Sequence, residues 1–289
     1  MKTDRIKIVE CPRDAMQGLH DYIPAETKSK YINALLKVGF DTLDMGSFVS
    51  PKAIPQLRDT AEVIRQLDLR DTVSKLLVIV ANQRGAKAAV EYDEITYLGF
   101  PFSISATFQQ RNINSTIEQS LERLQDVQEL CLQHNKKMVT YFSMAFGNPY
   151  DDPWNAEIVT KWADKLVNEY GVKILSMSDT IGSSSPKTIE WIFKELIPAF
   201  PNVEIGAHLH TTPDKWEEKI HTSIQNNCKR FDSAIKGYGG CPMAKDDLTG
   251  NMPTENLISY LEKSNLPHGL NMVEFNNCME LANTIFPVK

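Results

Sequence analysis

Short apolar runs alternate with longer amphipathic stretches along the whole sequence. The runs are rich in β-branched and aromatic residues and almost continuously apolar, which is typical of strands buried on both faces of a parallel sheet. We expect eight such strands: Ile6–Glu10, Thr42–Gly46, Leu76–Val80, Ile95–Phe100, Met138–Met144, Ile174–Ser178, Val203–His210 and Phe231–Gly237.

Helical patterns fall between these runs. The stretch Ala25–Val38 has apolar side chains at helical spacing and stops before Gly39, a common residue at helix C-termini. The stretch Ser115–His134 opens with Ser115 and Glu118, which match the pattern of a capping box. Further helices are expected at Trp154–Tyr170, Pro186–Phe200, Pro213–Asn227, Thr254–Lys263 and Val273–Ile285.

The alternation predicts the fold class. Repeated strand–helix units indicate a parallel α/β sheet, and eight of them within 289 residues predict a closed (β/α)₈ TIM barrel. An open doubly wound sheet is the alternative, and it usually binds ligands at a single crevice. Because no linker divides the sequence, we expect one catalytic barrel domain over residues 1–289. The barrel would span about 5–250, with extra C-terminal helices at about 254–285.

Composition narrows the class of protein. The formal net charge of −6 gives no basis for a nucleic-acid surface, and the longest strongly apolar run, Leu76–Ala81, is too short to cross a bilayer. The sequence opens directly into a strand pattern, so we expect no signal peptide. The five cysteines are far apart and include no Cys-x-x-Cys, which indicates a reducing, cytoplasmic setting.

Polar side chains gather where the predicted strands end, which is the face on which barrel enzymes build their active sites. The end of the first strand is followed by an Arg-Asp pair and a glutamine, and the seventh strand ends in two histidines. The candidates are Arg13, Asp14, Gln17, Asp44, Ser47, Ser176, Asp179, His208, His210, Cys241 and Asn251.

His208 and His210 form the most informative pair. Residues two apart on a strand point to the same face, so both imidazoles would project into the barrel mouth. Asp14 would join them if the first and last strands are neighbours, and Asn251 would add an amide oxygen. Such a set of oxygen and nitrogen ligands suits Mg²⁺ or Mn²⁺ better than zinc. The alternative is a pair of ordinary hydrogen-bonded residues at a strand end.

Arg13 and Cys241 are the other chemical candidates. An Arg-Asp pair on a surface is usually solvated, but directly after a barrel strand its guanidinium could stabilise an enolate or carboxylate oxygen. A lone cysteine is most often an inert apolar residue. Cys241 follows a glycine-rich turn, where its thiol could act as a general acid or base.

Several motifs resemble the signatures of 3-hydroxy-3-methylglutaryl-CoA lyases, and they follow in order over about 85% of the chain. They are Cys11-Pro12-Arg13-Asp14-Ala15-Met16-Gln17, Gly46-Ser47-Phe48-Val49-Ser50-Pro51-Lys52, Asn112-Ile113-Asn114, Ser178-Asp179-Thr180-Ile181-Gly182, His208-Leu209-His210 and Gly239-Gly240-Cys241-Pro242-Met243-Ala244-Lys245. The Arg-Asp and His-x-His elements alone mark the wider superfamily of metal-dependent lyases and synthases with a TIM barrel.

The resemblance implies a reaction and a role for each matching residue. It implies retro-Claisen cleavage of an acyl-CoA substrate to acetyl-CoA and acetoacetate, and a homodimer, which is common in the family. Arg13 would stabilise the enolate, Cys241 would transfer a proton, and Asp179 would belong to the catalytic group. The metal ligands would be Asp14, His208, His210 and Asn251. Gln17, Asp44, Ser47 and Ser176 would line the substrate site, with Glu255 supporting the Asn251 loop.

The sequence departs from the family pattern at four places. Ala15, Asp44 and Thr211 stand where glycine, glutamate and aspartate are usual, and the segment between Cys241 and Asn251 is one residue longer. Two alternatives therefore stay open. The first is another enzyme of the superfamily, either a Claisen-type synthase or a hydroxy-acid aldolase. The second is a barrel that binds metal or acyl-CoA without turnover.

Overall fold

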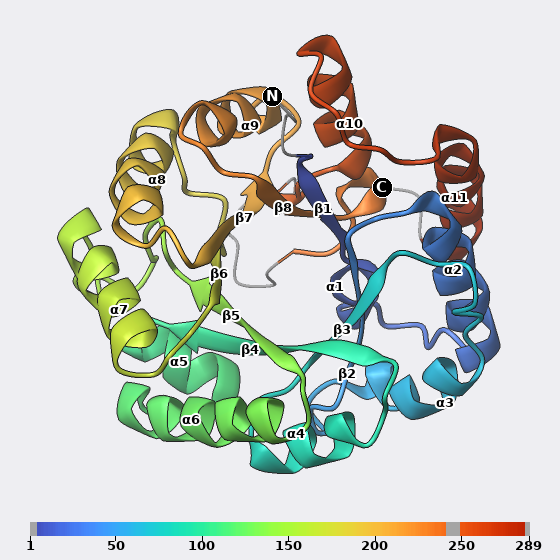
Figure 1. The fold of residues 1–289 in the computed structure, drawn as a ribbon, viewed down its shortest axis with the longest axis horizontal. Helices are drawn as coiled ribbons and strands as arrows, with labels where there is room; N and C mark the ends of the chain where they lie inside the picture. Colours follow the sequence, from blue (N-terminus) through green and yellow to red (C-terminus); the bar gives the residue numbers. More distant parts are fainter. Residues whose placement is uncertain (1–4, 241–248, 287–289) are drawn as a thin grey trace.

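Eight parallel strands close into a barrel in the computed structural model, which describes residues 5–240 and 249–286 (Figure 1). Neighbouring strands pair in chain order, and β8 pairs with β1 to close the ring. The predicted (β/α)₈ TIM barrel is confirmed. The strands are β1 (Lys7–Glu10), β2 (Thr42–Ser47), β3 (Lys75–Ile79), β4 (Ile95–Ser103), β5 (Lys137–Ser143), β6 (Ile174–Asp179), β7 (Glu204–Thr211) and β8 (Arg230–Ser233).

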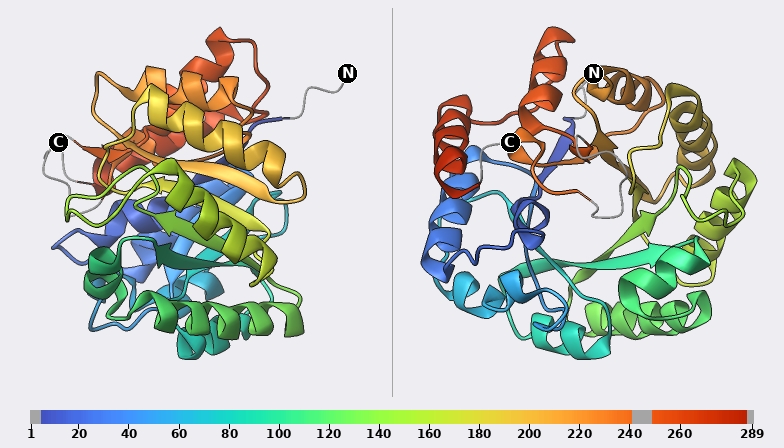
Figure 2. Two further views of the ribbon diagram at one scale, coloured as in Figure 1. Left: turned by 90° about the vertical axis from the view of Figure 1, so that its left-hand side faces the viewer. Right: turned by 180° about the vertical axis from the view of Figure 1, so that it is seen from behind.

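Helices surround the barrel, as the views from the side and from behind also show (Figure 2). The C-terminal helix lies beside α2, where Tyr31 meets Phe286 with ring centroids 5.7 Å apart. The helices are α1 (Pro12–Gln17), α2 (Ala25–Val38), α3 (Thr60–Arg65), α4 (Gln83–Val90), α5 (Ala106–Ile113), α6 (Ile117–Gln133), α7 (Ala156–Asn168), α8 (Pro186–Ala199), α9 (Trp216–Gln225), α10 (Thr254–Lys263) and α11 (Met272–Ile285), with 3₁₀ turns η1 (Pro55–Leu57) and η2 (Ile235–Gly237).

Local differences from the sequence predictions have clear physical causes. The eighth strand ends at Ser233, not Gly237, because Lys236 adopts a φ of 59° and the chain turns there. The capping box of α6 uses Thr116 and Gln119, one residue later than predicted. A ninth short strand, β9 (Gly250–Asn251), was not predicted; it pairs antiparallel to the end of β7.

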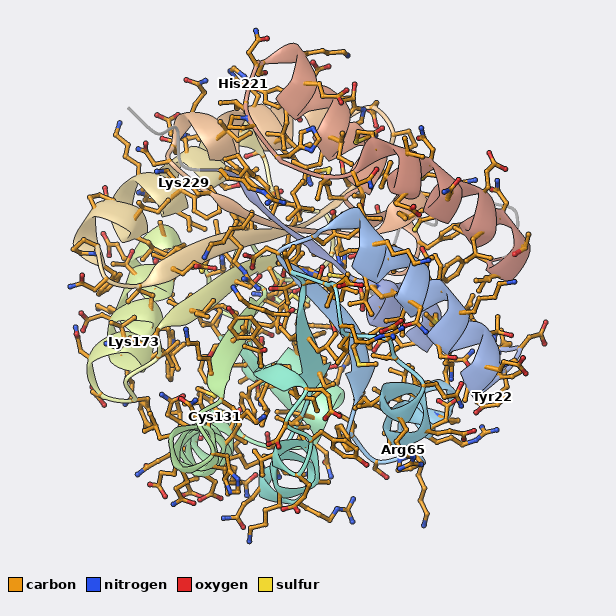
Figure 3. The ribbon with its side chains drawn as sticks, turned by 45° about the vertical axis from the view of Figure 1, so that its right-hand side comes forward. Tyr22, Arg65, Cys131, Lys173, His221 and Lys229 are labelled. Atoms are coloured by element: carbon orange, nitrogen blue, oxygen red, sulfur yellow. The ribbon has the colours of Figure 1, made fainter. Side chains whose placement is uncertain are left out.

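Buried apolar side chains form two clusters. The larger cluster fills the space between the strands and the helices (Figure 3). The smaller one, which includes Leu77, Val139 and Tyr141, faces the barrel interior. The interior beside β1, β7 and β8 is instead polar, with His208, Arg230 and Asp232 all buried. This polar side of the barrel positions the site below. Within the described residues, no helix combines the length and apolar character needed to cross a bilayer.

Candidate active site

Two histidines and an aspartate meet at the carboxyl ends of the strands. His208 and His210 lie on β7, and Asp14 lies on α1 directly after β1. Because β8 pairs with both β1 and β7, the two segments approach each other across it. One potential ligand atom from each of the three side chains lies within 4.8 Å of the other two, and all three residues are buried. The convergence of Asp14 with the His-x-His pair agrees with the prediction.

The cluster has the chemistry of a divalent-cation site. His210 Nδ1 is buried and has no hydrogen-bond partner among the described residues, although a buried polar atom normally has one. His208 Nδ1 lies 3.2 Å from Asp232 Oδ2, which leaves its Nε2 as the nitrogen that can bind a cation. Two imidazoles and one carboxylate therefore present ligand atoms around a common point, so the residues fit a bound metal.

The charges around Asp14 keep it ionised. Burial alone would raise the pKa of Asp14, but Arg13 and the two histidines outweigh that effect and lower it below its ordinary value. Burial and the neighbouring His208 lower the pKa of His210 to about 4, so this imidazole is neutral near pH 7. An ionised carboxylate and a neutral imidazole are the protonation states that a metal ligand needs.

Asn251 reaches the cluster because β9 pairs with β7, with Asn251 opposite His210. Its Nδ2 donates to Asp14 Oδ2 at 2.6 Å and to the Tyr238 carbonyl at 2.8 Å. A Cβ on Gly239, whose φ is 82°, would lie 2.6 Å from the Asp14 carbonyl, so only glycine fits this turn. The structure therefore places Asn251 against Asp14, and its role as a metal ligand stays a prediction.

Arg13 is held rigidly beside the same cluster. Its Nε donates to Asp44, and its Nη1 donates to Asp14 Oδ1 and to Gln17 Oε1, both at 2.9 Å. Its Nη2 donates to Asp44 Oδ2, so these bonds use four of the five N–H groups of the guanidinium. Although burial lowers the pKa of Arg13, Asp44 and Asp14 raise it above its ordinary value, so the group stays charged.

A cavity of about 420 Å³ opens at this end of the barrel. Its lining includes residues of α1, residues of the five strands β3 to β7, and Gly240 before Cys241, together with apolar side chains such as Val49, Ile79 and Phe108. Among the predicted site residues, Arg13, Asp14, Gln17, His208 and His210 line it. The structure thus brings the predicted cation site and the predicted anion-stabilising arginine into one chamber.

Other predicted site residues lie behind this lining. Asp44 is fully buried under Arg13, and the Ser47 hydroxyl donates to the Ile79 carbonyl. The Ser176 hydroxyl donates to Asp232 Oδ2 at 2.8 Å. Glu255 accepts from the Lys236 backbone N–H, and so supports the turn whose Tyr238 carbonyl binds Asn251. These contacts place the four residues around the site, and their predicted contact with substrate stays a prediction.

Asp179, which the resemblance places in the catalytic group, takes part in an ion pair and in hydrogen bonds behind the cavity. Its carboxylate accepts from the Lys219 ammonium at 2.7 Å and from the backbone and hydroxyl of Ser184. It is not part of the cavity lining. Lys219 is fully buried and also donates to the His210 carbonyl. Cys241, the other predicted proton-transfer residue, lies outside the described residues.

Sequence reasoning missed two residues that shape the site. Asp232 orients His208, and Lys219 binds Asp179. Tyr141, a polar residue that the sequence places on the fifth predicted strand, lines the cavity and packs edge-on against the His208 ring. A signal existed for Asp232, since an aspartate inside a predicted buried strand needs a partner. Lys219 lies within a predicted helix, where a lysine is usually exposed, so nothing in the sequence distinguished it.

Comparisons with known proteins identify the family of this chain. The family model described as HMGL-like matches residues 5–285. The chain is 33% identical over 255 residues to a hydroxymethylglutaryl-CoA lyase of Bacillus subtilis, covering 88% of this chain and 84% of that protein. It is 31% identical over 269 residues to the 3-hydroxy-3-isohexenylglutaryl-CoA/hydroxy-methylglutaryl-CoA lyase of Pseudomonas aeruginosa, covering 93% and 88%.

A solved structure of a related lyase is also similar to this chain. The crystal structure of the Bacillus subtilis HMG-CoA lyase matches with a TM-score of 0.90 and 30% sequence identity, over 97% of this chain and 94% of that one. The match to the family model covers almost all the described residues and includes every element that carries the site. The chain therefore belongs to the HMGL-like family of carbon–carbon lyases.

Proposed function

We propose that this protein is a divalent-cation-dependent hydroxymethylglutaryl-CoA lyase, which cleaves 3-hydroxy-3-methylglutaryl-CoA to acetyl-CoA and acetoacetate. The observation that carries the proposal is the convergence of Asp14, His208 and His210 in one cavity with the charged Arg13. The relatives named above, which share about a third of their residues with this chain over most of its length, support the same reaction.

Asp14, His208 and His210 would hold the cation, and the Asn251 side chain lies against Asp14 as a further candidate ligand. Carboxylate, imidazole and amide groups together suit Mg²⁺ or Mn²⁺. When bound, the cation would supply Lewis acidity toward the hydroxyl and carbonyl oxygens of the substrate. The buried, unpartnered Nδ1 of His210 is the feature of this chain that best fits such a group.

The chemistry requires that negative charge be stabilised as the carbon–carbon bond breaks. A base takes the proton of the C3 hydroxyl, the C2–C3 bond breaks, and its electron pair moves into the thioester as an enolate. C3 becomes the ketone of acetoacetate. Arg13 would hold the enolate oxygen, because its charge is fixed in a buried setting before the reaction begins. The enolate carbon then takes a proton to give acetyl-CoA.

We assign that last proton to the Cys241 thiol. Gly240, the residue directly before Cys241, lines the cavity, which supports a role for the thiol at this site. Replacing Cys241 with serine should lower kcat by about 10²-fold, since general acid–base catalysis contributes roughly this much. The Cys131→Ser variant is the matched control, because Cys131 is buried on α6. An unchanged kcat for Cys241→Ser would remove the thiol from the mechanism.

The lyase activity is tested by incubating the purified protein with 3-hydroxy-3-methylglutaryl-CoA and measuring acetoacetate and acetyl-CoA. Equal amounts of both products should form with Mg²⁺ or Mn²⁺, and none after chelation until the metal is restored. Absence of cleavage by metal-loaded protein would contradict the proposal. Consumption of acetyl-CoA with a 2-oxo acid would instead identify a synthase. The homodimer and the cytoplasmic location stay predictions.

A further inference from the structure

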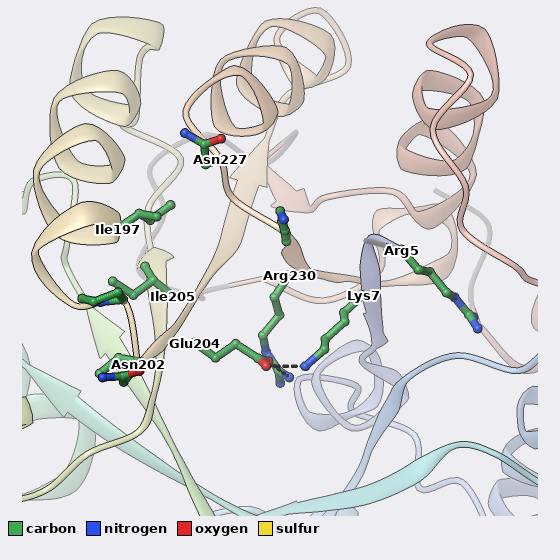
Figure 4. Close-up of a pocket in the computed structure, with 11 residues that line it drawn as sticks. Arg5, Lys7, Ile197, Asn202, Glu204, Ile205, Asn227 and Arg230 are labelled. Atoms are coloured by element: carbon green, nitrogen blue, oxygen red, sulfur yellow. Dashed lines mark hydrogen bonds and ion pairs between the residues drawn. The ribbon is translucent and has the colours of Figure 1, made fainter. Parts of the chain in front are cut away.

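Arg230 is a fully buried arginine at the end of the barrel opposite the active-site cavity. It is the first residue of β8, and it lines a second cavity of about 540 Å³ together with Lys7 and Glu204, the first residues of β1 and β7 (Figure 4). Its Nη1 donates to Glu204 Oε1 at 3.0 Å. A Cβ on Gly206 would lie 2.9 Å from Arg230 Cδ, so glycine at that position of β7 makes room for the side chain.

Arg230 also faces Asp232, two residues further along the same face of β8. Arg230 Nε lies 3.8 Å from Asp232 Oδ1, and both side chains are almost completely buried. Isolated buried charges cost several kcal/mol each, so each ion stabilises the other in this position. Glu204 pairs with both Lys7 and Arg230. Positive and negative side chains therefore alternate from the N-terminal ends of the strands up to Asp232.

Asp232 connects these charged side chains to the active site. Its second oxygen, Oδ2, accepts from Ser176 and contacts His208 Nδ1. With Nδ1–H directed at a carboxylate, the lone pair of His208 is placed on Nε2 and the ring is fixed in orientation. Arg230 and His208 thus contact opposite oxygens of one carboxylate, and a movement of Arg230 would reach the metal-ligand cluster through a single residue.

The contact between Arg230 and Asp232 is an ion pair without a hydrogen bond. Arg230 Nε and Nη2, Asp232 Oδ1 and the Tyr141 hydroxyl are all buried without a hydrogen-bond partner among the described residues. These are three kinds of polar group around the same part of the barrel interior. Arg230 therefore acts on Asp232 through its charge rather than through a hydrogen bond.

We propose that Arg230 is a positioning residue for the metal centre, holding Asp232 so that His208 presents Nε2 to the cation. The inference rests on the metal centre of the proposed function but not on the identity of the substrate. This role is more than structural support, because Arg230 at the N-terminal end of β8 would determine the orientation of His208 in the active-site cavity. Lys7 pairs with Glu204 and, among the described residues, makes no ion pair or hydrogen bond with Asp232, so it should lack this effect.

The first test measures the dissociation constant for Mn²⁺ in the purified protein by electron paramagnetic resonance. Arg230→Met keeps an unbranched, flexible stem and removes the charged guanidinium. We expect binding to weaken about 10-fold, the lower end of the range for partners behind a metal ligand, and Asp232→Asn to weaken it by about 10- to 100-fold. Lys7→Met is the matched control from the same cavity and should change it less than about 2-fold.

The second test uses metal-free protein labelled with ¹⁵N-histidine, with His208→Gln to assign the signal. Nitrogen shifts should show the Nδ1–H tautomer for His208 in the wild type, and a mixture of tautomers in Arg230→Met. Arg230→Lys, which keeps the charge, should restore most of the wild-type signal. If Arg230→Met does not fold, Gly206→Ala displaces the arginine by crowding its stem and should shift both readouts in the same direction.

The outcomes separate this inference from the proposed function. Wild-type affinity and tautomer in a folded Arg230→Met protein would overturn the positioning role and leave the metal centre intact. If Arg230→Met and Lys7→Met weaken Mn²⁺ binding equally, the positioning role would also be overturned, because the effect would then come from the total positive charge at this end of the barrel. A wild-type protein without Mn²⁺ affinity would overturn the metal centre itself, and with it this role.

Discussion

Asp14 and Asp179 lie at the carboxyl ends of two barrel strands and are both buried, yet their surroundings differ. Asp14 meets two imidazoles, one of which has a buried nitrogen without a partner, and it lines a cavity. Asp179 is surrounded by donors from Lys219 and Ser184 and lines no part of that cavity. The difference is that the Asp179 carboxylate is occupied by its partners, whereas the cluster around Asp14 keeps a buried imidazole nitrogen without a partner among the described residues, inside a cavity that could admit a ligand.

The largest effect should follow from His208→Ala. Removing one imidazole opens the cluster around Asp14, and both bound metal and lyase turnover should be lost, the latter by about 10³-fold or more, because a metal contributes several kcal/mol to such a transition state. Metal content by mass spectrometry and acetoacetate release are the two measurements. His221→Ala, on the outer helix α9, is the control. Full metal content in His208→Ala would refute the assignment of this ligand.

Asp179→Asn should act on stability more than on catalysis. The substitution leaves the buried Lys219 without its ion-pair partner, and breaking such a pair costs about 3–5 kcal/mol of unfolding free energy. Denaturant unfolding measures this loss, and Lys219→Met should show a similar one. The kcat of the folded variant should fall less than about 10-fold. A fall of 10²-fold at unchanged stability would instead support the catalytic role that the resemblance implies for Asp179.

Arg13→Met should act on catalysis while leaving the metal in place. Arg13 touches Asp14 but is not itself a ligand in the cluster. Loss of a preorganised group that stabilises an oxyanion costs about 10²- to 10³-fold in kcat. The measurements are kcat and metal stoichiometry for the same preparation, with Arg58→Met at the surface as a control. Parallel loss of metal and kcat would show that Arg13 acts only by organising Asp14.

Glu10 extends the comparison to a buried carboxyl whose hydrogen-bond partners are uncharged. It accepts from the Thr254 hydroxyl and the Ile235 N–H, and burial raises its pKa to about 8. Between the ordinary pKa of 4.5 and about 8 the folded protein binds more protons than the unfolded chain, so this group's stabilising contribution is lost as pH rises. The slope is at most about 1.4 kcal/mol per pH unit.

Glu10→Gln should therefore flatten the decline in unfolding free energy between pH 5 and 8, measured by denaturant titration at several pH values. Glu62→Gln, on the outer helix α3, serves as the control, and it should retain the wild-type slope. Identical slopes for wild type and Glu10→Gln would show that Glu10 is ionised in the folded protein.

The fold and the metal cluster could be predicted because they depend on periodic patterns. Eight buried runs determine the barrel, and alternation along β7 directs His208 and His210 to one face. Asp14 follows from the closure of β8 onto β1. The sequence could not predict that Lys219 turns inward to Asp179, or that a ninth strand, β9, is the element that carries Asn251 to the predicted cluster. Both depend on long-range contacts that have no periodic signature.

We propose that Asp14, His208 and His210 form the metal centre of a lyase. Crystals of the protein grown or soaked with Mn²⁺ and measured near the manganese absorption edge test it most directly. We expect a single strong anomalous peak in contact with Asp14, with Nε2 of His208 and with His210. A peak elsewhere in the barrel, or none at saturating Mn²⁺, would contradict it.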